Sequence, residues 1–221
     1  MPEDANPHLD ISSKENFLFF TLPMALNYQR NSYKLWESAC QSYNDIETRD
    51  IFDPNKVICM PIDTLRDKLL KYNVALQPNK QPLIWLRLCE TFSNSFFGDV
   101  RLFFSSNDYR VYEIKQYMIN NKKSFPYLSG EKIMNYWLYV MSNYTSSKFS
   151  DRENISIAPD THVLQSSVKL GIIKQSDLKR NDIREHTSKC WKSLCEHTDF
   201  LPIDLHTPLW LWSRNNFQCE L

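Results

Sequence analysis

Apolar residues recur every three or four positions along most of this chain, which is the spacing of helices with one buried face. No segment shows the strict alternation of apolar and polar residues that marks a half-buried strand. The pattern therefore predicts an all-α protein of about nine or ten helices. The predicted helices are one from Ser12 with a break at Pro23, one from Pro61, and residues 31–43, 81–96, 109–120, 131–143, 160–170, 181–197 and 203–213.

Local signals place the ends of several of these helices. Ser12 and Glu15 have the spacing of a capping box, in which two side chains satisfy free N–H groups. Asp160 stands where an N-cap residue is expected, and Gly171 is typical of the residue that follows a helix. We interpret the polar, serine-rich segment 142–154 as a loop that joins two helices of one unit.

Composition sets the broad class of the protein. The 221 residues are ample for a real core and fit one large domain or two small interleaved ones. Lys+Arg and Asp+Glu are both 26, so the zero net charge counts mildly against a nucleic-acid partner. No apolar run approaches the length of a membrane span, so no membrane partner is expected.

The compartment is inferred from the N-terminus and the cysteines. Met1-Pro2-Glu3-Asp4 is acidic and lacks the apolar stretch of a signal peptide. The six scattered cysteines are most simply reduced thiols in a chain without such a signal. We therefore expect an intracellular protein.

Lys132 is a candidate nucleophile. It stands two residues after Gly130, in the first turn of a predicted helix whose free N–H groups suit a DNA phosphate. An amine that attacks C1′ of a deoxynucleotide displaces the base and leaves a Schiff base to the opened sugar. This reactivity needs a partly dry pocket. Tyr136 follows one turn later on the same face, and it and Trp137 are candidates to line a pocket for a flipped base.

Asp160 is the complementary candidate, because a carboxylate near the sugar stabilises positive charge at C1′ or activates the lysine or a water. It also has a purely structural reading as an N-cap, and Lys132 has one as a solvated first-turn lysine. The joint hypothesis requires the two side chains to lie within about 10 Å of each other.

The two patterns together resemble the helix-hairpin-helix superfamily of DNA glycosylases, which includes endonuclease III and the archaeal 8-oxoguanine glycosylases. The family hairpin reads roughly Leu-Pro-Gly-Val-Gly-x-Lys. Here the segment from Pro126 to Lys132 keeps the second glycine and the lysine but not the first glycine. The family's Asp-x-His-Val element is similar to Asp160-Thr161-His162-Val163.

The resemblance implies one unit, residues 1–221, built from two interleaved helical lobes that flank a cleft, with the helix-hairpin-helix element at residues 121–140. It implies Lys132 as nucleophile and Asp160 as the essential carboxylate, with a separation nearer the archaeal type. A weaker similarity at residues 25–29 gives Gln29 as the residue that fills the gap in the duplex, and the tail 209–214 resembles the closing helix. The expected DNA-binding residues are Gln29, Ser129, Gly130 and His162, and the expected base-pocket residues are Asn27, Tyr136, Trp137 and Trp210.

No cofactor is expected. The three C-terminal cysteines, Cys190, Cys195 and Cys219, do not have the number or spacing of the iron–sulfur cluster of endonuclease III-like enzymes. The histidines make no recognised zinc spacing, and for His162 a structural role stays open beside a phosphate contact.

The leading hypothesis is therefore a monomeric DNA glycosylase with lyase activity that excises a damaged or modified base. Two alternatives stay open, a non-catalytic helix-hairpin-helix DNA-binding protein and a helical protein-interaction module. The long Lys132–Asp160 spacing favours an oxidised purine as substrate through the resemblance, while a modified base of foreign DNA, as in defence against phage, fits the chemistry equally.

Overall fold

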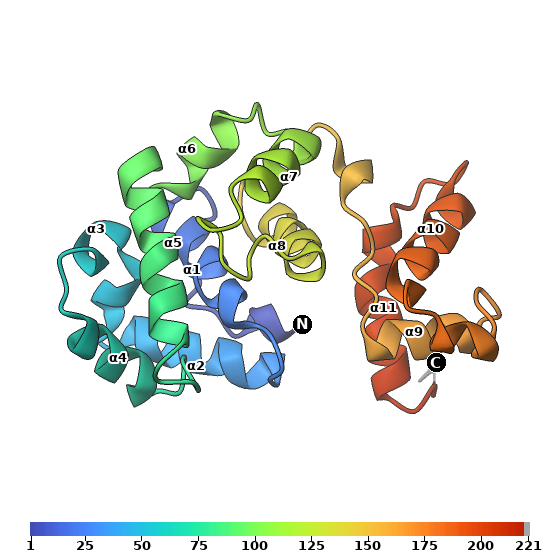
Figure 1. Cartoon of the computed structure of the whole chain (residues 1–221), viewed down its shortest axis with the longest axis horizontal. Helices are drawn as coiled ribbons and strands as arrows, with labels where there is room; N and C mark the ends of the chain where they lie inside the picture. The colour runs from blue at the N-terminus through green and yellow to red at the C-terminus, as the bar shows by residue number, and fades with distance from the viewer. Residues whose placement is uncertain (219–221) are drawn as a thin grey trace. The chain divides into compact units, whose positions relative to one another are not determined.

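The computed structural model describes residues 1–218, and all regular structure in that part of the chain is helical (Figure 1). The prediction of an all-α protein is thus confirmed. The α-helices of residues 1–150 are α1 (Lys14–Thr21), α2 (Ser32–Asn44), α3 (Pro54–Val57), α4 (Ile62–Lys71), α5 (Gln81–Phe96), α6 (Val100–Ser105), α7 (Val111–Asn120) and α8 (Glu131–Tyr144). Those of the remainder are α9 (Thr161–Lys169), α10 (Ile183–Cys195) and α11 (His206–Arg214).

Short 3₁₀ turns connect several of these helices. They are η1 (Pro2–Asp4), η2 (Pro23–Leu26), η3 (Arg49–Phe52), η4 (Arg152–Asn154), η5 (Gln175–Lys179) and η6 (Pro202–Leu205). The break predicted at Pro23 is η2, because a proline at the start of a turn has no N–H to offer the preceding helix. None of the helices within residues 1–218 has the length and apolar character needed to cross a membrane.

The chain divides into two compact units, Met1–Ser150 and Asp151–Leu221. Each unit is one continuous stretch of chain, whereas interleaved lobes were expected. Segment 142–154 was expected to be a loop within one unit. The first three residues of that segment belong to α8, and the division falls after Ser150. A polar, serine-rich composition suits a loop and a connection between units equally, so it does not distinguish them.

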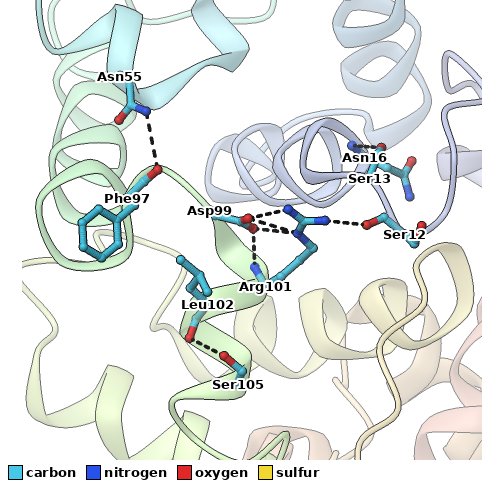
Figure 2. A network of polar contacts seen from close by, with 9 residues as sticks. All are labelled: Ser12, Ser13, Asn16, Asn55, Phe97, Asp99, Arg101, Leu102 and Ser105. Atoms are coloured by element: carbon cyan, nitrogen blue, oxygen red, sulfur yellow. Dashed lines mark hydrogen bonds and ion pairs between the residues drawn. The ribbon is translucent and has the colours of Figure 1, made fainter.

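Side-chain caps mark the starts of several helices. The Ser13 hydroxyl accepts the Asn16 N–H at 3.1 Å, so α1 is capped by Ser13 and the predicted capping box at Ser12 is wrong by one residue. The Asp99 carboxylate caps α6 through the Arg101 N–H. Figure 2 shows that the Arg101 guanidinium also binds Asp99 and donates to the Ser12 carbonyl at 2.9 Å. One arginine thus joins the start of α6 to the residues before α1.

Aromatic side chains dominate the core of the first unit. Phe19 of α1 packs against Trp36 of α2 and Phe52 of η3, and all three are buried. Trp85 of α5 is fully buried, and its indole N–H donates to the Ile51 carbonyl at 2.8 Å. Satisfying the one polar group of a buried tryptophan lets the whole ring contribute to packing.

The second unit has its own small core. Its buried apolar residues come from the segment before α9 and from each of its α-helices, namely Ile157, Val163, Trp191 and Leu209. The Ser166 hydroxyl donates to the Leu209 carbonyl at 2.7 Å, and the Trp191 indole donates to the Ser167 hydroxyl at 2.8 Å. These buried bonds fix α9 against α10 and α11, and therefore fix the position of the α9 N-terminus within this unit.

Glu3 is a fully buried carboxyl group in the first unit. Its Oε2 accepts a hydrogen bond from the Tyr136 hydroxyl at 3.0 Å, and burial raises the pKa of Glu3 to about 7. Burial, followed by the nearby Glu3 charge, also raises the pKa of Tyr136. Because the folded protein holds the Glu3 proton more tightly than the unfolded chain, this group favours folding at low pH.

We predict that the Glu3→Gln protein is more stable than the wild type at pH 8 and similar to it at pH 4.5. The pKa of Glu3 rises from 4.5 to about 7 on folding, so its contribution to stability is lost as pH rises through that window. The full loss corresponds to about 3 kcal/mol of unfolding free energy, and a neutral amide avoids it. Urea unfolding at both pH values measures the difference.

The exposed Glu37 of α2 provides the control, since Glu37→Gln should leave the pH dependence unchanged. A Glu3→Gln protein with the same stability relative to wild type at pH 4.5 and pH 8 would show that Glu3 does not titrate in this way.

Candidate functional site

The candidate hairpin consists of α7, the turn 121–130 and α8. Gly130 precedes α8 with an ordinary φ of −69°, so left-handed geometry does not explain this glycine. Its N–H instead donates to the Tyr127 carbonyl at 3.0 Å, and a Cβ on Gly130 would lie 3.2 Å from that oxygen. The short distance between the Gly130 backbone and the Tyr127 carbonyl therefore favours glycine at the end of the turn, directly before α8.

Lys132 is the second residue of α8 and is exposed. The structure therefore does not surround it with the partly dry pocket expected for a reactive amine. Tyr136 lies one turn further along the same helix and is held by its hydrogen bond to Glu3. The α8 face that carries Lys132 thus continues into a tyrosine fixed by a buried carboxyl group.

Trp137 belongs to the core and not to a base pocket. It has no exposed surface, its indole N–H donates to the Thr21 hydroxyl at 3.1 Å, and its ring packs against Phe104. We therefore withdraw Trp137 from the expected base-pocket residues. Trp137 directly follows Tyr136 in the sequence, but successive residues of a helix point about 100° apart, so the two side chains do not share a face.

Ser129 and Gly130 line an open hollow of about 590 Å³ on the first unit. The Ser129 hydroxyl donates to the Phe125 carbonyl at 2.8 Å, and Lys115 donates to the Asn135 side chain at 3.0 Å. The complete lining is Lys115, Ile119, Lys122, Tyr127, Ser129, Gly130, Glu131 and Met134. Segment 115–132 contains four lysines and one glutamate, which leaves a local charge of +3 in a chain of zero net charge.

Asn27 and Gln29 lie in the loop between η2 and α2. Asn27 is half-buried, and its side-chain oxygen accepts from the Ser32 hydroxyl at 2.8 Å. Gln29 is exposed and has a left-handed backbone with φ of 50°. This conformation is uncommon for a residue other than glycine, asparagine or aspartate.

Asp160 is the N-cap of α9. Its Oδ1 accepts the backbone N–H groups of His162 and Val163, both at 3.0 Å. The structural role predicted for Asp160 is therefore confirmed, and any chemical role would be additional to it. The cap holds the carboxylate at the positive end of the helix dipole, where negative charge is stabilised.

His162 and Trp210 meet beside this helix start. The His162 Nδ1 lies 3.1 Å from the Ser213 hydroxyl, and its ring makes an edge contact with Trp210 at 5.6 Å. The Arg214 guanidinium lies over the Trp210 ring, 4.9 Å from its centroid. Trp212 packs instead against Phe217, so the two tryptophans of α11 have different neighbours, as helical geometry predicts.

The candidate residues therefore form two groups. Lys132, Tyr136 and the hairpin belong to the first unit, and Asp160, His162 and Trp210 belong to the second. Because the positions of the units relative to one another are not determined, the separation of about 10 Å between Lys132 and Asp160 stays a prediction.

No group of three or more His, Cys, Asp or Glu side chains within residues 1–218 is arranged to hold a metal ion. Cys190 and Cys195 carry free thiols, and Cys219 lies outside the described residues. The Cys190 Sγ lies 3.8 Å from the His186 Nε2 within the same helix.

Two features of the first unit escape the sequence analysis. One is the buried Glu3, and the other is a stacked pair formed by Tyr28 and Tyr127. Nothing in the local sequence around Tyr127 indicates that Tyr28 is its partner.

A comparison with protein-family models found no match to this chain. Comparisons with curated proteins and with solved structures found none either.

Proposed function

We propose that this protein is a helix-hairpin-helix DNA glycosylase with associated lyase activity, which excises a damaged or modified base. The observation that carries the proposal is the occurrence in one chain of Lys132, in the first turn of α8, and Asp160, the N-cap of α9. Lys132 is exposed at a helix start that follows an irregular segment, where N–H groups without an intrahelical partner attract phosphate.

In the proposed reaction the Lys132 amine attacks C1′ of an extruded nucleotide. The new C–N bond forms as the bond between C1′ and the base breaks, and the base leaves with the bonding electrons and takes up a proton. The attached nitrogen then gives up one proton, and its lone pair forms a double bond to C1′ as the bond between C1′ and O4′ breaks. O4′ takes up a proton as the sugar ring opens, which gives the Schiff base. Lys132 is exposed in the structure, so the DNA itself must exclude water from the amine when it binds.

Asp160 supplies the negative charge in this proposal. Its carboxylate stabilises the positive charge that develops at C1′ as the base departs. The two cap bonds to Oδ1 hold the carboxylate in one orientation, so little reorganisation is needed during the reaction. His162 and Trp210, which contact each other beside Asp160, are the proposed phosphate contact and pocket wall of the second unit.

The hairpin supplies the proposed DNA contacts of the first unit. The local charge of +3 across residues 115–132 favours the phosphate backbone, and the hollow lined by Ser129 and Gly130 lies beside it. Gln29, an exposed residue of the loop before α2, is the residue proposed to fill the vacated base position. The substrate is an oxidised purine or a modified base of foreign DNA, which places the protein in the compartment that holds DNA.

The exposure of Lys132 and the cap role of Asp160 favour one alternative, a non-catalytic helix-hairpin-helix DNA-binding protein. Such a protein would bind duplex DNA with a strong dependence on salt but would form no covalent intermediate. A protein-interaction module would show neither property.

A borohydride-trapping screen on the wild-type protein separates these functions. The duplexes carry an abasic site, 8-oxoguanine or another modified base, and a tetrahydrofuran site serves as the control because it has no aldehyde. We expect a covalent complex with the abasic duplex and with one modified base, and none with tetrahydrofuran. Salt-dependent binding without trapping on any duplex would overturn the catalytic proposal.

A further inference from the structure

Tyr127 has an unusual backbone and a specific partner. Its φ is 61°, a left-handed value that costs energy for a bulky residue. Its ring stacks on that of Tyr28, with 4.1 Å between the centroids and 13° between the planes. The stack joins the turn before α8 to the loop that contains Gln29, two segments far apart in the sequence.

Lys80 completes this contact. Its Nζ lies 4.8 Å from the Tyr127 centroid and 5.5 Å from the Tyr28 centroid, within the range of cation–π attraction. A hydrogen bond with Tyr127 raises the pKa of Lys80, so the lysine is charged at neutral pH. The Tyr28 hydroxyl donates to the Gln77 side chain at 3.3 Å, which ties the pair to the segment before α5. We call Tyr28, Lys80 and Tyr127 the aromatic brace.

The brace connects directly to the start of α8. The Tyr127 carbonyl accepts the Gly130 N–H at 3.0 Å, and Gly130 lies two residues before Lys132. The Ser129 N–H donates to the Phe125 carbonyl at 3.0 Å in the same turn. A change in the Tyr127 backbone would therefore move the turn that presents Gly130, Glu131 and Lys132.

We propose that the aromatic brace is a positioning device, in which the Tyr127 ring holds the hairpin turn in the geometry that presents Lys132. This inference rests on the proposed function, because positioning has a chemical consequence only if Lys132 reacts. The ring compensates for the left-handed backbone, which a glycine would adopt without strain. The conformation of the turn thus depends on the contact of the Tyr127 side chain with Tyr28 and Lys80. A glycine at this position would adopt the same backbone but would not make this contact.

Tyr127→Gly separates the backbone from the ring. If residue 127 needs only its left-handed backbone, glycine will maintain or raise the melting temperature and leave trapping unchanged. If the brace positions Lys132, glycine will lower the melting temperature. It will also slow single-turnover trapping by about two- to tenfold at saturating DNA, the range expected for one aromatic pair. Tyr127→Phe keeps the stack and should restore most of the rate.

Phe97 provides a matched control in the same unit. It has a left-handed φ of 52° at the end of α5, but its side chain is 80% exposed (Figure 2). Phe97→Gly should therefore leave trapping unchanged and should not lower the melting temperature. The exposed Lys80 gives a second variant that does not threaten folding, and Lys80→Met should slow trapping by about twofold through lost cation–π attraction.

The outcomes distinguish this inference from the proposed function. If the wild type forms no trapped complex on any duplex, the proposed function and the inference both fail. If the wild type is trapped and Tyr127→Gly is trapped at the same rate, only the inference fails. If Tyr127→Gly does not fold, Lys80→Met takes its place in this comparison. A slower rate for these variants with unchanged Phe97→Gly supports the inference.

Discussion

The Lys132→Gln protein is expected to form no borohydride-trapped complex with a duplex that the wild type traps. Trapping requires a Schiff base between a protein amine and C1′ of the sugar, and the glutamine amide does not form one. Lys132 is exposed on α8, so its replacement removes no core packing and should leave the melting temperature unchanged. Gel analysis of reduced complexes measures the effect, and a parallel binding titration should give a similar Kd.

Two further variants make the Lys132 result specific. Lys132→Arg keeps the positive charge but offers a guanidinium that stays protonated, so it should bind DNA and still fail to trap it. Lys123 is an exposed lysine of the same hairpin. Lys123→Gln loses one positive charge and should bind DNA more weakly, but at saturating DNA it should be trapped at nearly the wild-type rate. Trapping of Lys132→Gln at the wild-type rate would mean that another amine is the nucleophile.

Asp160→Asn is expected to slow base release by about 100-fold or more while it costs little stability. Asparagine keeps an oxygen that accepts the His162 and Val163 N–H groups, so the cap of α9 survives. The negative charge that balances charge at C1′ is lost, and removal of one such group from an active site has effects of this size. Single-turnover excision and thermal unfolding measure the two consequences separately.

Asp160→Ala removes both functions of the residue. We expect the same loss of excision together with about 1 kcal/mol of destabilisation from the missing cap. Asp53, which caps α3 by accepting the Asn55 N–H at 3.0 Å, is the matched control, since Asp53→Asn should preserve both stability and excision. A fully active Asp160→Asn protein would leave Asp160 as a cap only.

Long periodic segments were predictable from the sequence. The predicted helix 81–96 coincides with α5, and 131–143 differs from α8 by one residue at its end. Apolar spacing sustained over three or more turns determines both helices. The short α6 was not predicted, because six residues contain too little periodicity and its start depends on the Asp99 cap and the Arg101 contact with Ser12.

The candidate site was predictable only as far as local signals extend. The turn at Gly130 and the cap at Asp160 follow from neighbouring residues, and both helix starts are confirmed. The burial of Trp137 depends on Thr21 and Phe104, and the burial of Glu3 depends on its packing near Tyr136. Contacts between residues so far apart in the sequence leave no periodic signal. The local sequence around a core tryptophan is therefore the same as that around a pocket tryptophan.

The same limit applies to the brace. Tyr127 stands within the segment that resembles the family hairpin but lacks the first glycine. Its backbone is left-handed, and its ring contacts Tyr28 and Lys80. The sequence shows that the first glycine of the motif is absent, and the structure shows the contact between Tyr127 and Tyr28 in the same segment.

Mapping the trapped adduct tests the central claim most directly. The wild-type protein is reduced with borohydride on an abasic duplex, digested with nuclease and protease, and the modified peptide is identified by mass spectrometry. The proposal predicts a single adduct, on the side chain of Lys132. An adduct on Lys122, Lys123 or any other amine, or a protein that binds the duplex and carries no adduct, would contradict it.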